Sequence, residues 1–483
     1  MKIKKIKLVN NTFFGTTEFD FTDSNGQVMD NIVLAGENGC GKTQLLDIIY
    51  DFSNLPTVGP VTDEKRIFTV LLSELEIEQI NQTLEDNYKL ISPTGEMEIS
   101  LDFQGPSGYW SRINGTYQSI DGGTIRTNTF NTSHLFSRVN IKSIFKSIYS
   151  TVEINYSPKD TTNITAKEID EEVSQSVRSG SDLASEIQQL LIDIQDNDAH
   201  ELQEWIDENK GIAPPESVQH RRINRFKRAF SQVFNKLNFS RIVTKDGKKK
   251  VYFKKEGRDV DIASLSSGEK QIVFRGAFLL RNQQSAKGSV ILIDEPEISL
   301  HPIWQEKIYD YYRNLFTETS GRQTSQMFMA THSQYVLSSA LENQSNTLIM
   351  LLKHTGANID IRKITAPVVL PAVTAAELNY VAFGIVSNDY HIELYGYLQN
   401  KIASNRGALE CTVKQCDTYI TQQSDYDPNL HYKNSVHIMQ NRTVNYETLP
   451  TYIRNAIDHP DSSRTFTRDE LERSIELLIK LCR

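Results

Sequence analysis

The stretch Ile32-Val-Leu-Ala-Gly-Glu-Asn-Gly-Cys-Gly-Lys-Thr43 joins a short apolar run to a GxxxxGKT loop, and a predicted helix follows. Its glycines let the backbone wrap closely around phosphates, with N–H groups pointing inward. Lys42 would bring a positive charge to the β- and γ-phosphates, and Thr43 a hydroxyl to Mg²⁺. The strand before the loop and the helix after it favour an ATP site over a chance match. The residues assigned to this loop are Gly36, Asn38, Gly39, Gly41, Lys42, Thr43 and Gln44.

A second apolar run, Val290-Ile-Leu-Ile-Asp-Glu-Pro-Glu297, ends in acidic residues. A lone carboxylate at the end of a buried strand is costly unless it meets a cation, so Asp294 is expected to hold Mg²⁺. Glu295 is the natural general base for the attacking water. His332 follows another apolar strand, at the strand end where open α/β sheets bind ligands, and would sense the γ-phosphate or orient the water. The alternative is an acidic strand end exposed in a loop, which the preceding apolar run argues against.

A serine-rich loop, Asp261-Ile-Ala-Ser-Leu-Ser-Ser-Gly-Glu-Lys-Gln271, leads into a predicted helix. Small, hydroxyl-bearing residues at a helix N-terminus can receive a γ-phosphate. This role is assigned to Ser266, Ser267, Gly268 and Glu269. In the usual arrangement the loop cannot reach the P-loop of its own chain. It would instead close the ATP site of a second copy in a head-to-tail pair. The alternative is an ordinary capped helix start.

The composition is that of a globular protein with a sizeable core, because 39% of its 483 residues are hydrophobic. The net charge of −9 does not indicate nucleic-acid binding, although a local basic face is compatible with it. The four cysteines show no CxxC pair and no zinc spacing, which fits a reduced interior. Residues 1–10 predict an edge strand and not a signal peptide, and no apolar run approaches the roughly 20 residues of a membrane span. We therefore expect a cytoplasmic protein.

The order of elements predicts an ATPase domain over residues 1–365 and a separate, mostly helical module over 366–483. An insertion is expected at about 60–240. Its first part alternates β-like runs with turns, and the clearest strands are 97–103 and 152–156.

The second part of the insertion, 167–238, is predicted to be helical. A break at 179–182 would let Ser181 or Asp182 cap the helix that follows. Beyond the insertion, a hairpin is expected to turn at Asp246-Gly247. No heptad pattern persists for three or four repeats, so no long coiled coil is predicted.

Together these motifs resemble the ABC-type ATPases of the SMC and OLD-like branch. The run Leu292-Ile-Asp-Glu-Pro-Glu-Ile-Ser-Leu-His-Pro302 is similar to that branch rather than to transporter cassettes. The resemblance covers roughly 1–60 and 240–350. It implies an α/β fold, in which a mixed sheet flanked by helices carries a helical insertion and a mostly helical C-terminal module. It also implies ATP and Mg²⁺ as cofactors and a D-loop at Ser299 to His301. Candidates for the Q-loop are Gln104 and Gln118.

Two departures from that branch narrow the expected function. The chain has no zinc hook and no long coiled coil, which argues against tethering of the SMC kind. It also lacks the acidic-cluster nuclease that OLD proteins carry after the ATPase. Compact stand-alone ATPases of this form resemble those of bacterial antiphage systems, with the ATPase subunit of Septu most similar and that of PARIS second. In both families the ATPase works with a separately encoded nuclease.

The segment Tyr452-Ile-Arg-Asn-Ala-Ile-Asp-His-Pro460 looks like the RNxxxH motif of HEPN-family ribonucleases, carried by Arg454, Asn455 and His459. In that family a histidine and an arginine from each protomer converge across a dimer and cleave RNA through its own 2′-OH without metal. Histidine would shuttle protons, and arginine would steady phosphate charge. A degenerate docking module and coincidence are the alternatives, because residues five apart do not stack on one helix face. His391 could join such a site or be a buried structural histidine.

Cationic residues gather before the serine-rich loop. The residues singled out are Arg221, Arg222, Arg225, Lys227, Arg228, Lys248, Lys249, Lys250, Lys254 and Lys255. In SMC-like dimers this region borders the side that faces nucleic acid, so nucleic-acid contact is one hypothesis. A solvated charged face is the usual outcome for such a run.

Three functions compete for this chain. The one that we favour is an ATP-controlled scaffold and sensor that holds or releases a partner nuclease. The second is a self-contained, ATP-gated ribonuclease that uses Arg454 and His459. The third is a DNA-repair ATPase of the SMC branch, against which the missing coiled coil argues. A transporter cassette is the least favoured, because of the large insertion and the extra C-terminal module.

Overall fold

A computed structural model describes most of the chain. The described residues are 1–54, 63–83, 93–102, 112–121, 124–131, 143–152, 176–180, 182–215, 223–224, 226–227, 230, 237–245, 247–281, 287–318, 320–355, 358–364, 367–439, 442–459 and 465–483. The chain forms two compact units, Met1–Lys363 and Ile364–Arg483. The first contains every residue assigned to the ATP site, and the second contains the RNxxxH segment.

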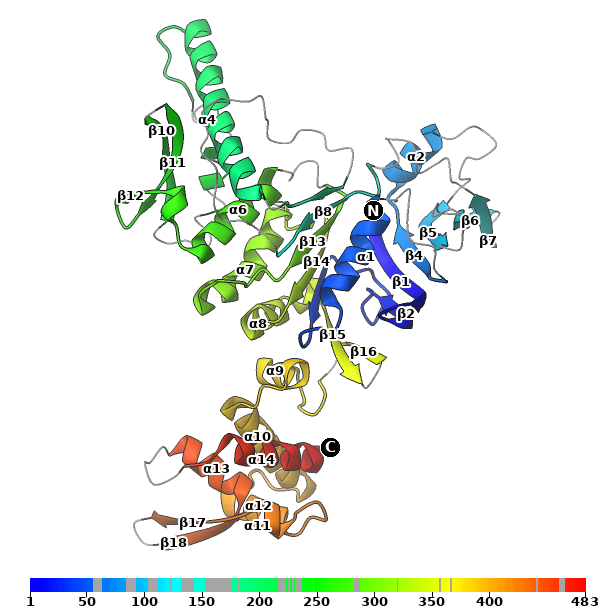
Figure 1. Cartoon of the computed structure of the whole chain (residues 1–483). Coiled ribbons are helices and arrows are strands. Elements are labelled where there is room, and N and C mark those ends of the chain that lie inside the picture. Colours follow the sequence, from blue (N-terminus) through cyan, green and yellow to red (C-terminus); the bar gives the residue numbers. More distant parts are fainter. Residues whose placement is uncertain are drawn as a thin grey trace. The chain divides into compact units, whose positions relative to one another are not determined.

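The centre of the first unit is a seven-stranded sheet in the order β16-β15-β3-β14-β13-β8-β9 (Figure 1). Its strands are β3 (Asn31–Ala35), β8 (Ser147–Ser150), β9 (Val177–Arg178), β13 (Val290–Asp294), β14 (Gln326–Thr331), β15 (Thr347–Thr355) and β16 (Asn358–Lys363). Neighbouring strands run parallel, except for the antiparallel β15–β16 pair. β3, β8, β13 and β14 are buried along their whole length, as apolar strands covered on both faces should be.

Four helices pack on this sheet and on one another: α1 (Lys42–Asn54), α6 (Ser267–Arg281), α7 (Pro302–Leu315) and α8 (Gln334–Glu342). This mixed sheet flanked by helices confirms the predicted α/β fold class. Because β3, β13 and β14 are parallel, their carboxyl ends meet at one edge of the sheet. Gly36, Asp294 and His332 all lie at that edge, which we call the catalytic edge and where ligands bind in open α/β sheets.

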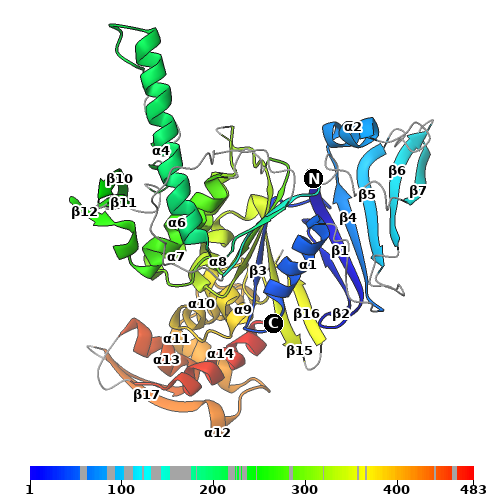
Figure 2. The same cartoon turned by 45° about the horizontal axis from the view of Figure 1, so that its top comes forward.

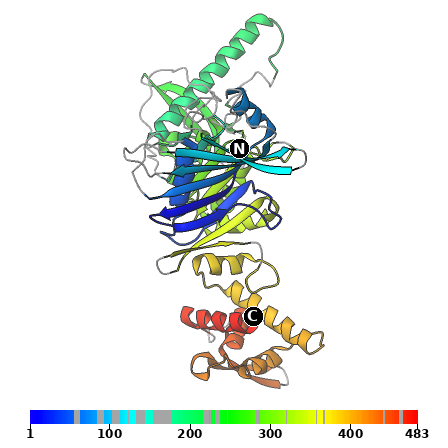
Figure 3. The same ribbon diagram turned by 90° about the vertical axis from the view of Figure 1, so that its right-hand side faces the viewer.

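A six-stranded antiparallel sheet, in the order β2-β1-β4-β5-β6-β7, forms the other part of the core. Its strands are β1 (Lys2–Asn11), β2 (Gly15–Asp20), β4 (Lys65–Leu71), β5 (Pro93–Asp102), β6 (Arg112–Asp121) and β7 (Thr124–Asn131), and Figure 3 shows them as a layer in blue to cyan. The prediction that residues 1–10 form an edge strand is wrong, because β1 pairs with both β2 and β4. Ile3, Ile6 and Leu8 are fully buried, and the lysines between them suit an inner antiparallel strand with one wetter face.

The segment 60–240, predicted as an insertion, is divided among several parts of the first unit. β4 to β7 and α2 (Glu74–Thr83) accompany the antiparallel sheet, and β8 and β9 extend the seven-stranded sheet. The predicted strand at 97–103 coincides with β5 up to Asp102, whereas Phe103 and residues 153–156 lie outside the described residues.

The helical part of that segment contains α4 (Leu183–Glu208), a helix of 26 residues whose far end extends away from the sheets (Figure 2). Asp182 is its N-cap residue but makes no side-chain cap, and Ser181 lies outside the described residues. The following basic segment is described at only a few positions. Three of these are the buried Ile223, Phe226 and Phe230.

The predicted hairpin is confirmed as β10 (Leu237–Lys245) and β11 (Lys248–Lys255), with Lys245 opposite Lys248. Gly247 in the turn has a φ of +73°, and Asp246 lies outside the described residues. A third strand, β12 (Arg258–Asp261), pairs with β11 and leads into the serine-rich loop.

The second unit is mostly helical, as predicted, but it also contains a hairpin of β17 (Tyr432–Met439) and β18 (Arg442–Thr448) that we did not anticipate. Its helices are α9 (Ala375–Phe383), α10 (Asn388–Asn405), α11 (Val413–Thr421), α12 (Pro428–His431), α13 (Leu449–Asp458) and α14 (Arg468–Cys482). A core that includes Leu394, Leu398, Ile453 and Ile475 joins α10, α13 and α14. None of the helices in the described part of the chain combines the length and the apolar character that a membrane span requires.

Candidate active site

The loop of residues 36–41 joins β3 to α1 and turns through glycines with positive φ angles. Two of them have no room for a side chain. A Cβ at Gly36, where φ is +147°, would overlap the carbonyl oxygen of Leu352, and a Cβ at Gly41, where φ is +92°, would overlap the ring of Phe13. The loop therefore holds a backbone conformation that glycine adopts readily and other residues do not. Such a conformation lets main-chain N–H groups approach an anion.

Lys42 is the first residue of α1, and its side chain is buried. Its Nζ donates hydrogen bonds of 2.8 Å to the carbonyl oxygens of Gly36 and Glu37. Burial lowers the pKa of Lys42, while the Cys40 thiol and the Glu295 carboxylate oppose this shift. Neutral carbonyls are weaker partners for an ammonium than phosphate oxygens. The lysine therefore fits a phosphate ligand at the mouth of the loop.

The hydroxyl and the carboxylate predicted to hold Mg²⁺ are in contact, because Thr43 Oγ1 donates to Asp294 Oδ1 over 3.1 Å. Asp294 ends β13 and is buried. Burial raises the pKa of Asp294 to about 6, against the hydrogen bond from Thr43 and the charge of Arg275. A cation here would favour the ionised carboxylate, and Mg²⁺ takes oxygen ligands of this kind. The donor set therefore fits Mg²⁺.

Glu295 and His332 are also in contact, with Nε2 of the histidine 2.9 Å from Oε1 of the glutamate. The other ring nitrogen, Nδ1, lies 3.1 Å from the carbonyl oxygen of Gly36. Both ring nitrogens thus lie within hydrogen-bond distance of an oxygen atom. The hydrogen bond from His332 is the main cause that lowers the pKa of Glu295, so this carboxylate is ionised at neutral pH. His332 links the predicted base to the P-loop.

Glu297 is a further member of the site to which the sequence assigned no role. Its Oε1 accepts hydrogen bonds from the backbone N–H of His332 over 2.6 Å and from Thr331 Oγ1 over 2.9 Å. Its carboxylate is buried, and this burial raises its pKa. Glu297 therefore fixes the turn that presents His332. Its position two residues after the predicted base was the available signal, but a surface acid would look the same.

The serine-rich loop enters α6 as predicted. Ser266 and Ser267 are exposed at the start of the helix. Glu269 was assigned to the same phosphate-binding set, but its Oε2 accepts from the backbone N–H and the hydroxyl of Ser266, at 2.8 and 2.9 Å. Its Oε1 pairs with Lys255 on β11 over 2.8 Å. Glu269 thus caps the helix, and the two serines are exposed beside it, whereas Gly268 is buried.

The segment predicted as the D-loop packs against this helix start, since a Cβ on Gly268 would overlap the carbonyl oxygen of Ser299. Ser299 itself has a φ of +62°, and His301 caps α7. The structure describes the position of only one of the two Q-loop candidates. Gln118 belongs to β6 of the antiparallel sheet, and Gln104 lies outside the described residues.

An aromatic pair that the sequence analysis missed lies beside the P-loop. The Phe13 ring is 39% exposed, and its centroid lies 6.5 Å from that of His354. His354 Nε2 is 3.0 Å from the carbonyl oxygen of Gly39. An exposed ring at this place offers a π-face to a nucleobase. The available signal was the repeated phenylalanine in the β1–β2 turn, of which Phe14 fills the core.

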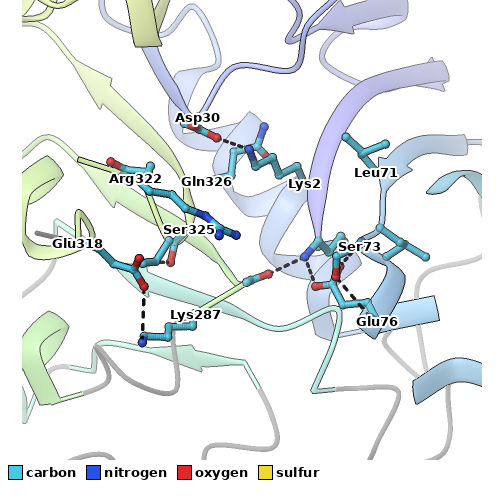
Figure 4. A pocket seen from close by; sticks show the side chains of 15 residues that line it. Lys2, Asp30, Leu71, Ser73, Glu76, Lys287, Glu318, Arg322, Ser325 and Gln326 are labelled. Carbon is cyan, nitrogen blue, oxygen red and sulfur yellow. Dashed lines mark hydrogen bonds and ion pairs between the residues drawn. The ribbon is translucent and has the colours of Figure 1, made fainter. Parts of the chain in front are cut away.

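A pocket of about 410 Å³ lies at the opposite edge of the seven-stranded sheet (Figure 4). It is lined near the amino ends of β3, β13 and β14 by Asp30, Gly288 and Gln326, among others. Charges of both signs border it, including an ion pair of Lys2 with Asp30. No residue assigned to the ATP site is among its lining residues. The pocket is therefore separate from the catalytic edge.

The basic residues proposed to meet nucleic acid are only partly described. Arg221, Arg222 and Arg225 lie outside the described residues. On β11, Lys249 approaches Asp196 of α4 at 3.8 Å and Lys250 approaches Asp261 at 3.6 Å. The neighbouring Lys248 is exposed. Part of this charge therefore joins the hairpin to the rest of the first unit.

In the second unit, the RNxxxH residues lie at the carboxyl end of α13. Arg454 Nη2 pairs with Asp458 Oδ2 over 2.7 Å, and its Nη1 donates to Asn455 Oδ1 over 3.0 Å. Asn455 is buried, and His459 is the exposed C-cap residue. His391 is fully buried, with Nε2 2.9 Å from Ser474 Oγ, and burial lowers its pKa to about 3. It is a structural histidine of the core between α10 and α14.

Three SMC head domains are among the solved structures similar to this chain. The SMC head bound to the C-winged helix domain of ScpA is 12% identical, covers 75% of this chain and 98% of its own length, and has a TM-score of 0.44. The head with an extended coiled coil from Pyrococcus furiosus, bound to the C-terminal domain of ScpA, is 12% identical over 75% and 96%, with a TM-score of 0.41. The head domain from Thermotoga maritima is 14% identical over 75% and 99%, with a TM-score of 0.37.

No curated protein matches the sequence. A family match, however, covers most of the chain. Residues 1–337 of the 483 match the family described as AAA ATPase domain, and this range includes every residue of the catalytic edge. The protein belongs to the AAA ATPase domain family and is a nucleotide-binding ATPase of the P-loop type.

Proposed function

We propose that the protein is an ATP-binding and ATP-hydrolysing scaffold and sensor of an antiphage defence complex, which forms ATP-sandwich dimers that control a partner nuclease. The observation that best supports control by ATP is the chain of contacts from Glu295 through His332 to the carbonyl oxygen of Gly36. It joins a base, a polar sensor and a phosphate-binding loop. The antiphage role and the nuclease partner rest on the resemblance in sequence.

In this proposal one protomer binds ATP with Lys42, and Mg²⁺ with Thr43 and Asp294. The Mg²⁺ would neutralise charge on the phosphates. Glu295 accepts a proton from the attacking water, and His332 holds the carboxylate in place and senses the γ-phosphate. Glu297 in turn orients His332 through the 2.6 Å hydrogen bond to its backbone N–H. The catalytic edge would thus read the state of the nucleotide through direct contacts.

The second half of each site would come from the partner, through Ser267 and Gly268. Two observations support this. Ser267 is exposed at the amino end of α6, with the helix dipole behind it. The hydroxyl of the neighbouring Ser266 donates to Glu269, so the helix is already capped without Ser267. A phosphate of a second copy is the ligand that such a surface fits.

Ser267→Arg tests the sandwich. A bulky cation at this position should block closure, so ATP-driven dimerisation is expected to disappear. ATP binding to the single protomer should stay within about threefold of wild type, because the P-loop is untouched and a threefold change is less than 1 kcal/mol. Sedimentation with and without ATP measures dimerisation, and titration with a fluorescent ATP analogue measures ATP binding. Ser320→Arg, at an exposed position in a turn outside the serine-rich loop, is the control. Unaltered dimerisation of Ser267→Arg would contradict the split site.

A ribonuclease in the second unit is the second candidate. It is favoured by the exposed His459 at the end of α13, on the same helix as Arg454. The 2.7 Å ion pair with Asp458 holds the arginine at that end. A degenerate module that docks a partner is the competing function of this unit.

His459→Ala decides between these two functions of the second unit. If it is an ATP-gated ribonuclease, the wild-type protein should cleave total RNA in a way that differs with and without ATP. The variant should lose roughly 100-fold or more of that activity with its proton shuttle. His437→Ala, on the β17 hairpin of the same unit, is the matched control. Gel analysis of RNA and plasmid DNA gives the readout. No cleavage by wild type, or equal cleavage by His459→Ala, would remove the ribonuclease and leave the docking role.

A further inference from the structure

Arg275, on the third turn of α6, is a fully buried cation. Its guanidinium makes four hydrogen bonds. Nε donates to Ser150 Oγ at 2.8 Å, and Nη2 donates to the carbonyl oxygens of Ser150 and Asp294 at 3.0 and 2.6 Å. Nη1 donates to the carbonyl oxygen of Glu295 at 3.1 Å. A charge without water is tolerated when its donors are satisfied in this way.

The acceptors of Arg275 lie at the catalytic edge. Ser150 ends β8 and Asp294 ends β13, and Glu295 is the predicted general base. Glu295 has a φ of +44°, a left-handed conformation that is strained for a residue with a side chain. Its N–H donates to the carbonyl oxygen of Ala330 at 2.9 Å, and its own carbonyl accepts from Arg275. The strained residue is therefore held from both sides, and its carboxylate is aimed at His332.

The helix that carries Arg275 is the one that begins at the exposed Ser267. α6 makes a second contact with the catalytic segment, because Gln271 Nε2 donates to the carbonyl oxygen of Pro296 at 3.0 Å. It is also packed tightly on α7, where a Cβ on Gly276 would overlap the hydroxyl of Tyr311. A shift of the amino end of α6 therefore moves the groups that hold the main chain of Glu295.

We propose that Arg275 is a positioning residue that couples the two ATP sites of a dimer. Binding of the partner's nucleotide at Ser267 would fix the position of α6. Arg275 would then hold the main chain of the general base Glu295 in its own protomer. This inference rests on the proposed ATP-sandwich dimer. A lysine cannot replace the arginine fully, because a single ammonium does not match acceptors spread over the ends of two strands.

Arg275→Met and Arg275→Lys separate positioning from binding. In Arg275→Met, kcat for ATP hydrolysis should fall about 100-fold, since a displacement of about 1 Å can have that effect. The Kd for ATP should stay within about threefold, because Arg275 touches no P-loop residue in the described structure. Arg275→Lys should lose less of kcat. Arg322→Met, an exposed arginine of the pocket at the opposite edge, should match wild type.

Mixed dimers test the coupling. A Ser267→Arg protomer is joined covalently to a wild-type protomer, because the variant alone should not dimerise. The variant's own ATP site is then closed by an intact partner, while its own α6 binds no nucleotide of the partner. With coupling, hydrolysis falls well below half of the wild-type rate. Hydrolysis at half the rate means that the sites act independently and overturns the coupling.

Two results of the single variants would overturn the positioning role. One is a kcat within threefold of wild type in Arg275→Met. The other is a parallel loss of ATP binding and thermal stability in both variants, which would mean that Arg275 supports the fold of the site. A different result would show that the proposed ATP-sandwich dimer does not form. In that case the Glu295→Gln protein stays monomeric with ATP, whatever residue occupies position 275.

Discussion

Lys42→Ala is expected to abolish the response of the protein to ATP. The ammonium of Lys42 lies at the mouth of the P-loop, 2.8 Å from the carbonyl oxygens of Gly36 and Glu37. Its removal takes away the one side-chain charge that the loop directs at the phosphates. A hydrogen bond to a charged group contributes up to about 3 kcal/mol, so the Kd for ATP should rise about 100-fold. Calorimetric titration with ATP and Mg²⁺ measures this directly.

The fold should survive this change. The alanine removes a buried charge whose pKa is already lowered by burial, and the carbonyls of Gly36 and Glu37 can accept from water at the mouth of the loop. Lys245→Ala, at an exposed position on β10, controls for the loss of a lysine elsewhere. If Lys42→Ala keeps the wild-type affinity for ATP, the assignment of the P-loop is wrong, because no other residue of the loop could supply the lost positive charge.

The parts of the fold and site that could be predicted are those with local causes. The P-loop needs its glycines and lysine within eight residues, and the acid at the end of β13 follows directly from its apolar run. The hairpin at Gly247 depends on one turn. For each of these, the residues that determine the structure are neighbours in sequence, so the pattern is visible before any tertiary contact is known.

The parts that could not be predicted depend on contacts between distant segments. Arg275 meets Ser150, which lies 125 positions earlier in the chain. Its role therefore has no local signature, and an arginine in a helix ordinarily predicts a solvated face. The position of β1 inside its sheet has a similar cause, because Lys65–Leu71 pairs with it from beyond α1. The capping role of Glu269, by contrast, was open to prediction from the Ser-x-x-Glu spacing.

Glu295→Gln is expected to have the largest effect on turnover and to trap the dimer. The amide is nearly the same size as the carboxylate. It can still accept a hydrogen bond from His332 Nε2, which lies 2.9 Å from Oε1 of Glu295 in the wild-type protein. It cannot take a proton from water, so kcat should fall by roughly 10²–10⁴-fold. It also removes a negative charge beside the triphosphate, so ATP binding should not weaken. Single-turnover hydrolysis and sedimentation with ATP measure the two effects.

The trapped dimer is the more decisive of these two effects, because it depends on both halves of the site. Slow hydrolysis leaves ATP bound at Lys42, and the exposed Ser267 of the partner can then stay on the γ-phosphate. Adding Ser267→Arg to Glu295→Gln should return the protein to a monomer while ATP remains bound. Glu342→Gln, an exposed glutamate at the end of α8, should behave as wild type. If Glu295→Gln dissociates as readily as wild type in ATP, the nucleotide does not join two protomers, and the serine-rich loop is then an ordinary capped helix start.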